Sequence, residues 1–327
     1  MIIPEARFSL WADFIERSFL DGEFKELIAK GIINGATSNP AIFKNAILTS
    51  AAYKEQLSTL TGLTPKEKYE ALAIFDIQKA ADILRPLYDA GDDGYVSIEV
   101  DPFLCDDTQA TIAEGIRLHQ MIGRPNVMIK VPATDAGYGA MEVLAAQGIA
   151  VNATLIFSVY QALRCAKAFE KAAIQSGKPV DTVISVFVSR IDRAIDETLR
   201  AKDVKTGKMG ILNAAEIYNE VQACKVAKCR VLFASTGVKG DEFRASYYID
   251  ELLAFNSVNT APIDTIKAYV QRAEQHLKLP IPSQVIDSHR IHVAQAGVNM
   301  SKVVEDQIAE GLEAFKTAFG DILNTLE

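Results

Sequence analysis

The sequence has little cysteine, and this scarcity limits the kind of protein it can encode. Only four cysteines occur among 327 residues, Cys105, Cys165, Cys224 and Cys229, and none of them forms a CxxC pair. A domain held together by disulfides, or a zinc ribbon, would need more closely paired cysteines. We therefore expect reduced and mostly buried thiols, and a cytoplasmic location.

Long apolar runs and an excess of positive charge are also missing. No stretch of about 18 apolar residues occurs, so we expect no membrane-spanning helix. The first 20 residues lack a basic segment followed by a clean apolar segment, so we expect no secretory signal. The 34 Lys+Arg against 42 Asp+Glu give a net charge of −8, which disfavours a general nucleic-acid binder.

Motifs for nucleotides and metals are absent as well. There is no GxGxxG after the first predicted strand and no GxxxxGK[ST], which argues against the open-sheet nucleotide-binding folds. The four histidines are scattered. His289 and His292 are three residues apart, but no carboxylate stands at ligand spacing, so we predict no metal site.

Short apolar runs alternate with longer amphipathic runs along the chain. The predicted strands are 8–13, 31–39, 95–101, 126–131, 148–155, 182–188, 230–235 and a weaker 255–260. The predicted helices include 16–29, 64–89, 108–122, 136–147, 159–176, 211–228, 263–278 and a long C-terminal helix at 299–325. This alternation favours a parallel sheet covered by helices.

Eight strands indicate a (β/α)8 TIM barrel with extra helices rather than an open sheet. A length prior of about 150 residues per domain would suggest two domains, but such barrels often exceed about 250 residues, so we expect one domain over 1–327. We expect helical decoration at 40–63. Residues 287–302 could form a loop over the barrel mouth or a helix. The C-terminal helix could cover the mouth or pack on a second subunit.

Strict alternation along each strand predicts which side chains face the barrel interior. Each predicted inward set includes a polar or ionisable side chain in the C-terminal half of its strand: Ser9, Trp11 and Asp13; Thr37 and Asn39; Ser97, Glu99 and Asp101; Met128 and Lys130; Ala150, Asn152 and Thr154; Val183, Ser185 and Phe187; Val231, Phe233 and Ser235. Because barrel active sites form at the carboxyl ends of the strands, these residues are candidate site residues.

Lys130 is the most informative of them, since it stands in the apolar run "NVMIKV". A buried ammonium group is costly unless it is paired or neutralised, and Asp13 and Glu99 are candidate partners. Desolvation lowers the pKa of an amine, and a neutral amine can attack a carbonyl carbon to form a Schiff base. The alternative is a structural lysine held in a salt bridge.

Two long segments resemble the transaldolase family. The segment "GATSNPAIF" (35–43) resembles the first signature of that family, and 126–162, which begins "NVMIKVPATDAGYG", resembles the second, which contains the Schiff-base lysine. The segments "VSIEVDPFLCDDT" (96–108) and "VISVFVSRID" (183–192) are similar to the family's third-strand and sixth-strand regions. The resemblance implies a cofactor-free (β/α)8 transaldolase of the pentose phosphate pathway that acts on sugar phosphates.

The resemblance also implies a role for each matching residue. Lys130 corresponds to the Schiff-base lysine and Asp13 to the acid/base for the C4 hydroxyl, while Glu99 and Thr154 correspond to the pair that positions a water. The remaining matches are substrate-binding: Asn39, Asn152 and Ser185 for the dihydroxyacetone unit, Phe187 on the pocket wall, and Arg190 for the phosphate.

The seventh-strand end departs from the family pattern. Many members have a second phosphate-binding arginine two residues after the serine there, where this chain has Gly237 in "ASTGVKG". We expect Ser235 and Lys239 to take over this phosphate contact. A lysine is a point charge without the bidentate geometry of arginine, and Lys239 could instead be a solvated surface charge.

Two other functions remain open at this stage. Fructose 6-phosphate aldolases share the fold and the lysine, but they resemble short chains with tyrosine at the position of Phe187 and glutamine at that of Glu99. A non-catalytic barrel that only binds phosphosugars is the second alternative. The presence of Phe187, Glu99 and the extra chain length favours a transferase.

Overall fold

Eight parallel strands close into a barrel in the computed structural model, which describes residues 2–272 and 276–327. Each strand pairs with the next in the chain, and β8 pairs with β1. The strands are β1 (Ser9–Ala12), β2 (Gly35–Thr37), β3 (Tyr95–Glu99), β4 (Val127–Pro132), β5 (Ala150–Ile156), β6 (Thr182–Phe187), β7 (Cys229–Ala234) and β8 (Ser257–Ala261). This is the predicted (β/α)8 TIM barrel, so the predicted fold is confirmed.

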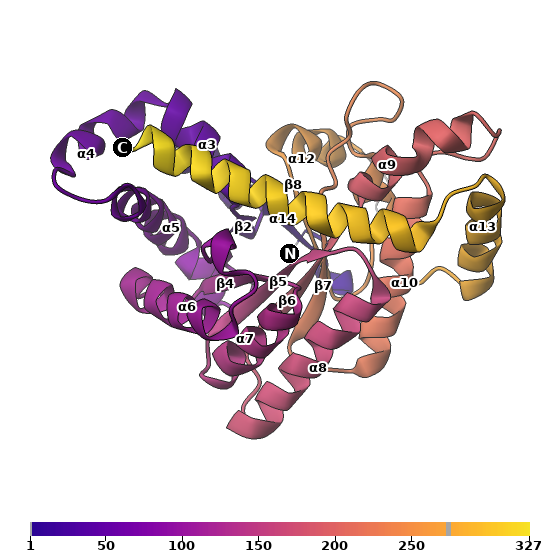
Figure 1. The fold of residues 1–327 in the computed structure, drawn as a ribbon, viewed down its shortest axis with the longest axis horizontal. Coiled ribbons are helices and arrows are strands. Elements are labelled where there is room, and N and C mark those ends of the chain that lie inside the picture. Colours follow the sequence, from indigo (N-terminus) through magenta and orange to yellow (C-terminus); the bar gives the residue numbers. More distant parts are fainter. Residues whose placement is uncertain (1, 273–275) are drawn as a thin grey trace.

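Helices surround the barrel and cover one of its ends (Figure 1). The helices are α1 (Arg17–Asp21), α2 (Glu23–Ala29), α3 (Pro40–Thr49), α4 (Lys54–Thr59), α5 (Pro65–Asp89), α6 (Thr108–Ile122), α7 (Asp135–Ala146), α8 (Val159–Ser176), α9 (Ser189–Arg200), α10 (Met209–Cys224), α11 (Tyr247–Glu251), α12 (Ile263–Val270), α13 (Ser283–Gln295) and α14 (Met300–Thr325). Three short 3₁₀ turns are η1 (Pro4–Ala6), η2 (Ala51–Tyr53) and η3 (Pro102–Leu104).

Several helix predictions need correction at their boundaries. The predicted helix 16–29 is two helices, because the backbone at Gly22 leaves the helical region between α1 and α2. The predicted helix 211–228 ends early, because Lys225 adopts a left-handed conformation that terminates α10. Helix α12 ends at Val270, and residues 276–278 of the predicted helix 263–278 are not helical; residues 273–275 lie outside the described residues.

Other segments settle questions that the sequence left open. The predicted decoration at 40–63 consists of α3, η2 and α4, and most of 287–302 is helical, in α13 and the start of α14.

Helix α9 was not among the predicted helices. Its buried Ile191, Ile195 and Leu199 recur every four residues, which is the spacing that could have revealed it.

The inward face predicted for the seventh strand is wrong. Leu232 is paired in register with Ser185 and packs with the barrel interior, whereas Phe233 packs against Tyr218 of α10, outside the barrel. The physical reason is the backbone of Ser235, whose φ is +55°. A left-handed residue interrupts the regular alternation of side chains along a strand. The prediction assumed that Ser235, Phe233 and Val231 share one face, but Phe233 and Val231 belong to the outer face.

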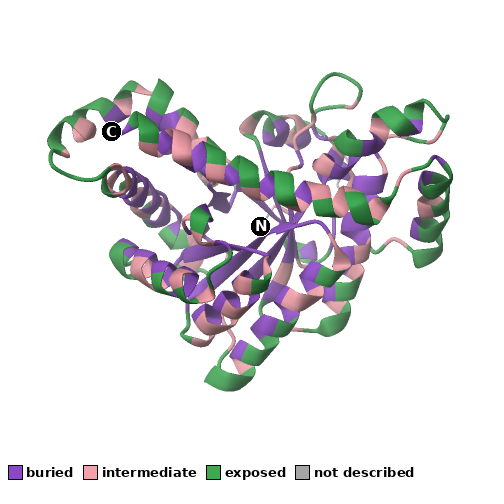
Figure 2. Cartoon of the chain, in the orientation of Figure 1, coloured by how far each residue is buried: buried purple, intermediate pink, exposed green. Residues whose placement is uncertain are grey.

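The core has two layers separated by the strands. The larger layer lies between the strands and the surrounding helices. The smaller fills the barrel interior with side chains that include Trp11, Tyr95, Met128 and Leu232, and it extends to residues of α9, α13 and α14. Figure 2 shows the strands buried along their length, while exposed residues lie on the outer faces of the helices. Trp11 is fully buried and does not line the cavity described below, so it fills the core.

Helix α14 crosses the mouth of the barrel (Figure 1). Its 26 residues extend about 39 Å, and it packs against α3, α5 and α9. Near its C-terminal end, Lys44 Nζ contacts Asp321 Oδ2 at 2.6 Å, and Lys68 Nζ donates to the carbonyl oxygen of Leu326 at 2.6 Å. Of the two positions left open for this helix, the chain adopts the one over the mouth.

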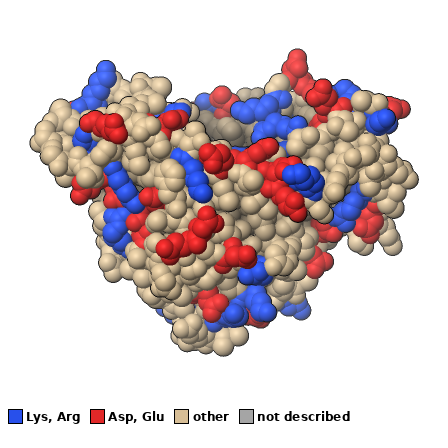
Figure 3. Space-filling view, in the orientation of Figure 1, with Lys and Arg blue, Asp and Glu red and all other residues tan. Residues whose placement is uncertain are grey.

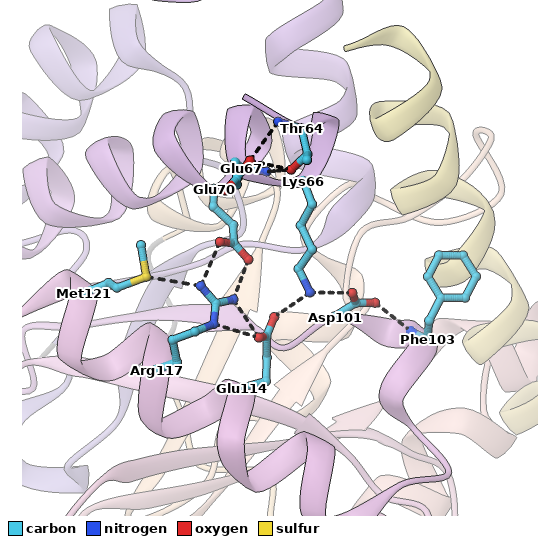
Figure 4. A network of polar contacts seen from close by, with 9 residues as sticks. All are labelled: Thr64, Lys66, Glu67, Glu70, Asp101, Phe103, Glu114, Arg117 and Met121. Carbon is cyan, nitrogen blue, oxygen red and sulfur yellow. Dashed lines mark hydrogen bonds and ion pairs between the residues drawn. The ribbon is translucent and has the colours of Figure 1, made fainter. Parts of the chain in front are cut away.

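A charged network joins α5 and α6 beside the end of β3 (Figure 4). Arg117 donates to both carboxylate oxygens of Glu70, at 2.8 and 2.5 Å, and to Glu114 at 2.6 Å. Lys66 contacts Asp101 at 2.7 Å and Glu114 at 3.1 Å. Because Glu70 and Glu114 are buried, these cations compensate carboxylates that would otherwise be costly to desolvate.

Candidate active site

A cavity of about 200 Å³ opens at the carboxyl ends of the strands, beneath α14. It is lined by Asp13, Thr37, Asn39, Ala41, Lys130, Asn152, Thr154, Ser185, Phe187, Arg190, Ala234, Ser235, Thr260, Ala314 and Phe315. Every residue to which the resemblance gave a role is in this lining except Glu99 and Lys239. Residues far apart in the sequence are thus brought together because parallel strands end at the same side of the barrel.

Lys130 lies in the wall of this cavity and is 5% exposed. Its Nζ donates to the backbone carbonyl of Ser38 at 2.9 Å, and it lies 3.4 Å from Glu99 Oε2. The ring of Phe315, from α14, has its centre 6.0 Å from the same nitrogen. The amine therefore faces a small enclosed space, as a residue that forms a covalent bond with a small carbonyl compound must.

Glu99 contacts the lysine from the side, and it does not line the main cavity. Glu99 and Lys130 are register partners on β3 and β4, so their side chains lie next to each other on the inner face. Apart from Lys130, no described group donates to the Glu99 carboxylate. Burial raises the pKa of Glu99 to about 7, although the neighbouring Lys130 lowers it. A carboxyl group with a pKa near neutrality can both accept and donate a proton.

Asp13 follows the end of β1 and also lines the cavity. Its Oδ1 accepts a hydrogen bond from Thr37 Oγ1 at 2.8 Å, and that hydroxyl is 2.6 Å from Thr260 Oγ1. Desolvation raises the pKa of Asp13, while the charge of Lys130 and the bond from Thr37 act against this rise. Asp13 is therefore placed and polarised as an acid/base group would be.

Polar side chains of β3, β5 and β6 form a connected row on another wall. Ser185 Oγ donates to Asn152 Oδ1 at 2.6 Å, and Asn152 Nδ2 donates to Ser97 Oγ at 3.1 Å. The hydroxyl of Thr154 is buried with no hydrogen-bond partner among the described residues. Leu155 next to it has a φ of +59°, where the pairing of β5 with β6 shifts register. This bulge re-aims the end of β5 at the cavity.

Asn39 lines the opposite wall at the start of α3. Its side-chain oxygen accepts from Ile42 N at 3.0 Å, so it is the N-cap of that helix. The cap fixes the side chain and leaves its amide nitrogen free of any described partner. The same residue can therefore hold a helix and offer two donors to a bound molecule.

The cationic end of the cavity lies at β6, β7 and the start of α9. Arg190 stacks over the Phe187 ring at 5.1 Å, and Ser235 lies across from it in the lining. Figure 3 shows lysine and arginine side chains gathered beside a hollow, between the positions of α12 and α9 in Figure 1. Lys239 is exposed on the loop after β7 and does not line the cavity, so its phosphate contact stays a prediction.

Sequence reasoning missed five lining residues: Ala41 of α3, Ala234 of β7, Thr260 of β8, and Ala314 and Phe315 of α14. Thr260 could have been found, since alternation along β8 places it on the same face as Val258. Ala314 and Phe315 could not, because nothing in the apolar stripe of the C-terminal helix shows which surface it covers.

A second hollow, of about 650 Å³, lies between α8, α10 and α14, and no lysine lines it. A third, of about 690 Å³, is lined by Lys228, which is exposed and paired with Asp181 at 3.1 Å. Within residues 2–272 and 276–327 there is no group of three or more His, Cys, Asp or Glu that could hold a metal ion. In the same residues, no helix is both long enough and apolar enough to cross a membrane.

Comparisons with known proteins agree with this geometry. Residues 10–326 match the family described as Transaldolase/Fructose-6-phosphate aldolase. A transaldolase of Campylobacter jejuni subsp. jejuni is 47% identical, with 98% of this chain and 99% of the relative covered. A transaldolase of Helicobacter pylori is 42% identical, with 97% and 99% covered.

Among solved structures, a fructose-bisphosphate aldolase from Campylobacter jejuni aligns with 97% of this chain and 91% of its own. The TM-score of 0.41 and the identity of 11% are too low to carry an argument. The family match spans nearly the whole chain, and the relatives match end to end. This chain belongs to the Transaldolase/Fructose-6-phosphate aldolase family.

Proposed function

We propose that this chain is a transaldolase, a transferase that moves a dihydroxyacetone unit from a ketose phosphate to an aldose phosphate. Sedoheptulose 7-phosphate or fructose 6-phosphate is the donor, and glyceraldehyde 3-phosphate or erythrose 4-phosphate is the acceptor, as in the pentose phosphate pathway. The observation that carries the proposal is a buried amine, Lys130, in a small polar cavity beside Glu99 and near Asp13.

The reaction begins when Lys130, in its deprotonated form, attacks C2 of the ketose. Glu99, through a water held by Thr154, delivers the proton that lets the carbinolamine lose its hydroxyl as water, leaving an iminium ion. Asp13 then removes the C4 hydroxyl proton, and the C3–C4 bond breaks. The electron pair of that bond moves into the iminium, and an aldose phosphate leaves.

The three-carbon unit stays on Lys130 as a resonance-stabilised carbanion until the acceptor arrives. Asn39, Asn152 and Ser185 hold its hydroxyl groups, and Phe187 walls the pocket. Arg190 and Ser235 bind the phosphate of the incoming aldose, and the bond-forming steps run in reverse. Transfer prevails over protonation only if water is kept away from the carbanion, which a cavity closed by α14 favours.

A coupled assay tests the proposal. Fructose 6-phosphate and erythrose 4-phosphate should give sedoheptulose 7-phosphate and glyceraldehyde 3-phosphate. Lys130→Ala should abolish turnover, and Lys130→Arg should do the same, because a guanidinium stays protonated and cannot form the imine. A wild-type protein that binds the sugar phosphates without turnover would instead be the non-catalytic binder.

The same assay separates transfer from simple cleavage. Without an acceptor, a transaldolase should release dihydroxyacetone only slowly from fructose 6-phosphate. Rapid release would identify the chain as a fructose 6-phosphate aldolase.

The charged, water-soluble substrates and the reduced cysteines also support a cytoplasmic location, which we include in the proposal.

A further inference from the structure

Gly237 does not supply the second phosphate-binding cation, and the local packing leaves little room for one. A Cβ atom at Gly237 would lie 3.1 Å from Cγ of Pro262, which is a crowded contact. An arginine at this position would therefore require its neighbours to shift. Helix α9 carries two further cations at the phosphate end of the cavity, Arg190 and Arg193.

Arg193 lies one turn after Arg190 on α9. No described carboxylate lies within 4.0 Å of either guanidinium group, although both arginines line a hollow of about 640 Å³ that adjoins the main cavity. Burial lowers the pKa of Arg190, and the positive charge of Arg193 lowers it further, while Glu310 acts in the opposite direction. The two cations are thus close enough to repel each other.

The carboxylates nearest to these arginines are engaged elsewhere. Asp192 accepts from Gly210 N at 2.6 Å and from Tyr248 at 3.0 Å. On α14, Asp306 is paired with Lys302, and Glu310 accepts from Gln307 at 2.8 Å. These carboxylates keep their charge, but none of them forms an ion pair with Arg190 or Arg193, so both guanidinium groups retain N–H donors for an anion.

A chain of hydrogen bonds connects Arg193 to the cavity. Arg193 Nη1 donates to Ser189 Oγ at 3.2 Å, and Ser189 Oγ is 3.1 Å from Ser235 Oγ, which lines the cavity. Because a guanidinium can only donate, the bond from Arg193 uses Ser189 as an acceptor. Ser189 is 2% exposed, and Ser235 Oγ is the only described acceptor that its own hydrogen can reach.

The direction of the chain follows from this constraint. Ser189 donates to Ser235 Oγ, so the hydroxyl hydrogen of Ser235 is free to point into the cavity. Ser235 then acts as a donor toward a group that can only accept, such as the oxygens of a phosphate dianion. Donation from the Arg193 cation polarises the Ser189 hydroxyl and strengthens its hydrogen bond to Ser235, which holds the Ser235 oxygen in place with its own hydrogen toward the cavity.

We propose that Arg193 is a positioning residue of the phosphate subsite, which acts through Ser189 to hold Ser235 as a donor aimed at a phosphate monoester. The proposal rests on the proposed function and adds a determinant of substrate class, the preference for phosphorylated over unphosphorylated sugars. Arg193 also adds positive charge beside Arg190. It thereby compensates for Gly237, which stands where many family members have a second phosphate-binding arginine.

The test compares five variants with two donor substrates. Arg193→Gln and Ser189→Ala should each raise KM for fructose 6-phosphate about tenfold, the effect of losing one hydrogen bond to a charged group, with kcat nearly unchanged. With unphosphorylated fructose as the donor, neither variant should change kcat/KM. Arg193→Lys should have a KM for fructose 6-phosphate between those of the wild type and Arg193→Gln, since lysine retains a hydrogen-bond donor and a positive charge.

Arg200→Gln is the matched control, because Arg200 is on the same helix but is exposed and paired with Glu242 at 2.5 Å. It should behave as the wild type does. The proposal is overturned if Arg193→Gln lowers kcat/KM equally for both donors, which would indicate general damage to α9. It is also overturned if Lys239→Gln raises KM for the phosphorylated donor while Arg193→Gln does not.

Failure of the proposed function would be visible separately. The wild-type protein would then show no turnover of fructose 6-phosphate with erythrose 4-phosphate. Turnover by the wild type with an unchanged KM in Arg193→Gln would overturn only the role of Arg193.

Discussion

At the scale of single residues, the account depends on how burial sets protonation around Lys130. Glu99 has no described hydrogen-bond donor other than this lysine, and desolvation outweighs the attraction of the lysine charge. Desolvation also raises the pKa of Asp13, and the charge of Lys130 and the hydrogen bond from Thr37 partly offset this rise. Two carboxyl groups with raised pKa values near one amine provide the proton donors and acceptors that imine chemistry needs.

Glu99→Gln should change the pH dependence of activity. In the wild type, kcat/KM should show an ionisation near pH 7, where Glu99 changes from carboxylic acid to carboxylate. The variant cannot titrate there, so this ionisation should disappear while activity falls roughly 100-fold, as for loss of a proton-transferring group. Persistence of the same ionisation in Glu99→Gln would assign it to another group.

The same residue predicts a pH effect on stability. The pKa of Glu99 is higher in the folded chain than its ordinary value of 4.5, so folding favours the protonated form. The stabilisation is complete below about pH 4.5 and is lost as the pH rises through about 7. Relative to Glu99→Gln, the wild type should therefore lose free energy of unfolding between pH 5 and 8, as measured by urea denaturation; a constant difference would contradict the raised pKa.

At the scale of elements, α14 determines how closed the cavity is. Phe315 is 5% exposed and lies over the lysine, and Gly311 allows the helix to approach β5 closely. A Cβ atom at Gly311 would lie 2.9 Å from Leu155 Cδ2 and 3.4 Å from Arg190 Nη1. The helix thus touches both the bulge of β5 and the cationic end of the site.

Phe315→Ala should shift the reaction from transfer toward release. Removal of the ring opens a path for water to the bound carbanion, so dihydroxyacetone release without an acceptor should rise several-fold. The variant should also lose roughly 3 kcal/mol of stability, as is typical when a buried phenylalanine is truncated. Phe315→Leu keeps an apolar side chain over the lysine and serves as the control. Equal release by wild type and Phe315→Ala would show that α14 does not exclude water.

The network between α5 and α6 yields a prediction about stability alone. Arg117→Ala leaves the buried Glu70 and Glu114 without their main cation, and should cost roughly 2–3 kcal/mol, less than for a fully buried pair because Arg117 is partly exposed. Arg124→Ala breaks a more exposed pair with Asp82 and should cost less than about 1 kcal/mol. Chemical denaturation of both variants measures the difference, and equal losses would contradict the assigned role of burial.

At the scale of the whole molecule, the sequence predicted the barrel and most of its site for physical reasons. Parallel strands alternate with helices and end at one side of the barrel, so polar residues at the strand ends had to meet there. The prediction failed where the backbone departs from regular alternation, as at Ser235, whose left-handed conformation no apolar pattern reveals.

Long-range packing is the second reason why the sequence did not predict the whole site. The apolar stripe of α14 predicts a helix with one buried face, but it does not say which surface that face covers. The folded chain places it over the barrel mouth, and Phe315 thereby becomes part of the site. Lys239 illustrates the reverse case, since its place in the sequence suggests a phosphate contact but its side chain is exposed outside the cavity lining.

Reductive trapping tests the central claim most directly. The protein is incubated with fructose 6-phosphate and sodium borohydride, digested and analysed by mass spectrometry. We predict a reduced three-carbon adduct on the peptide that contains Lys130, and none in Lys130→Ala. An unmodified Lys130 in a wild-type protein that still turns over the substrate, or an adduct on a different lysine, would contradict the account.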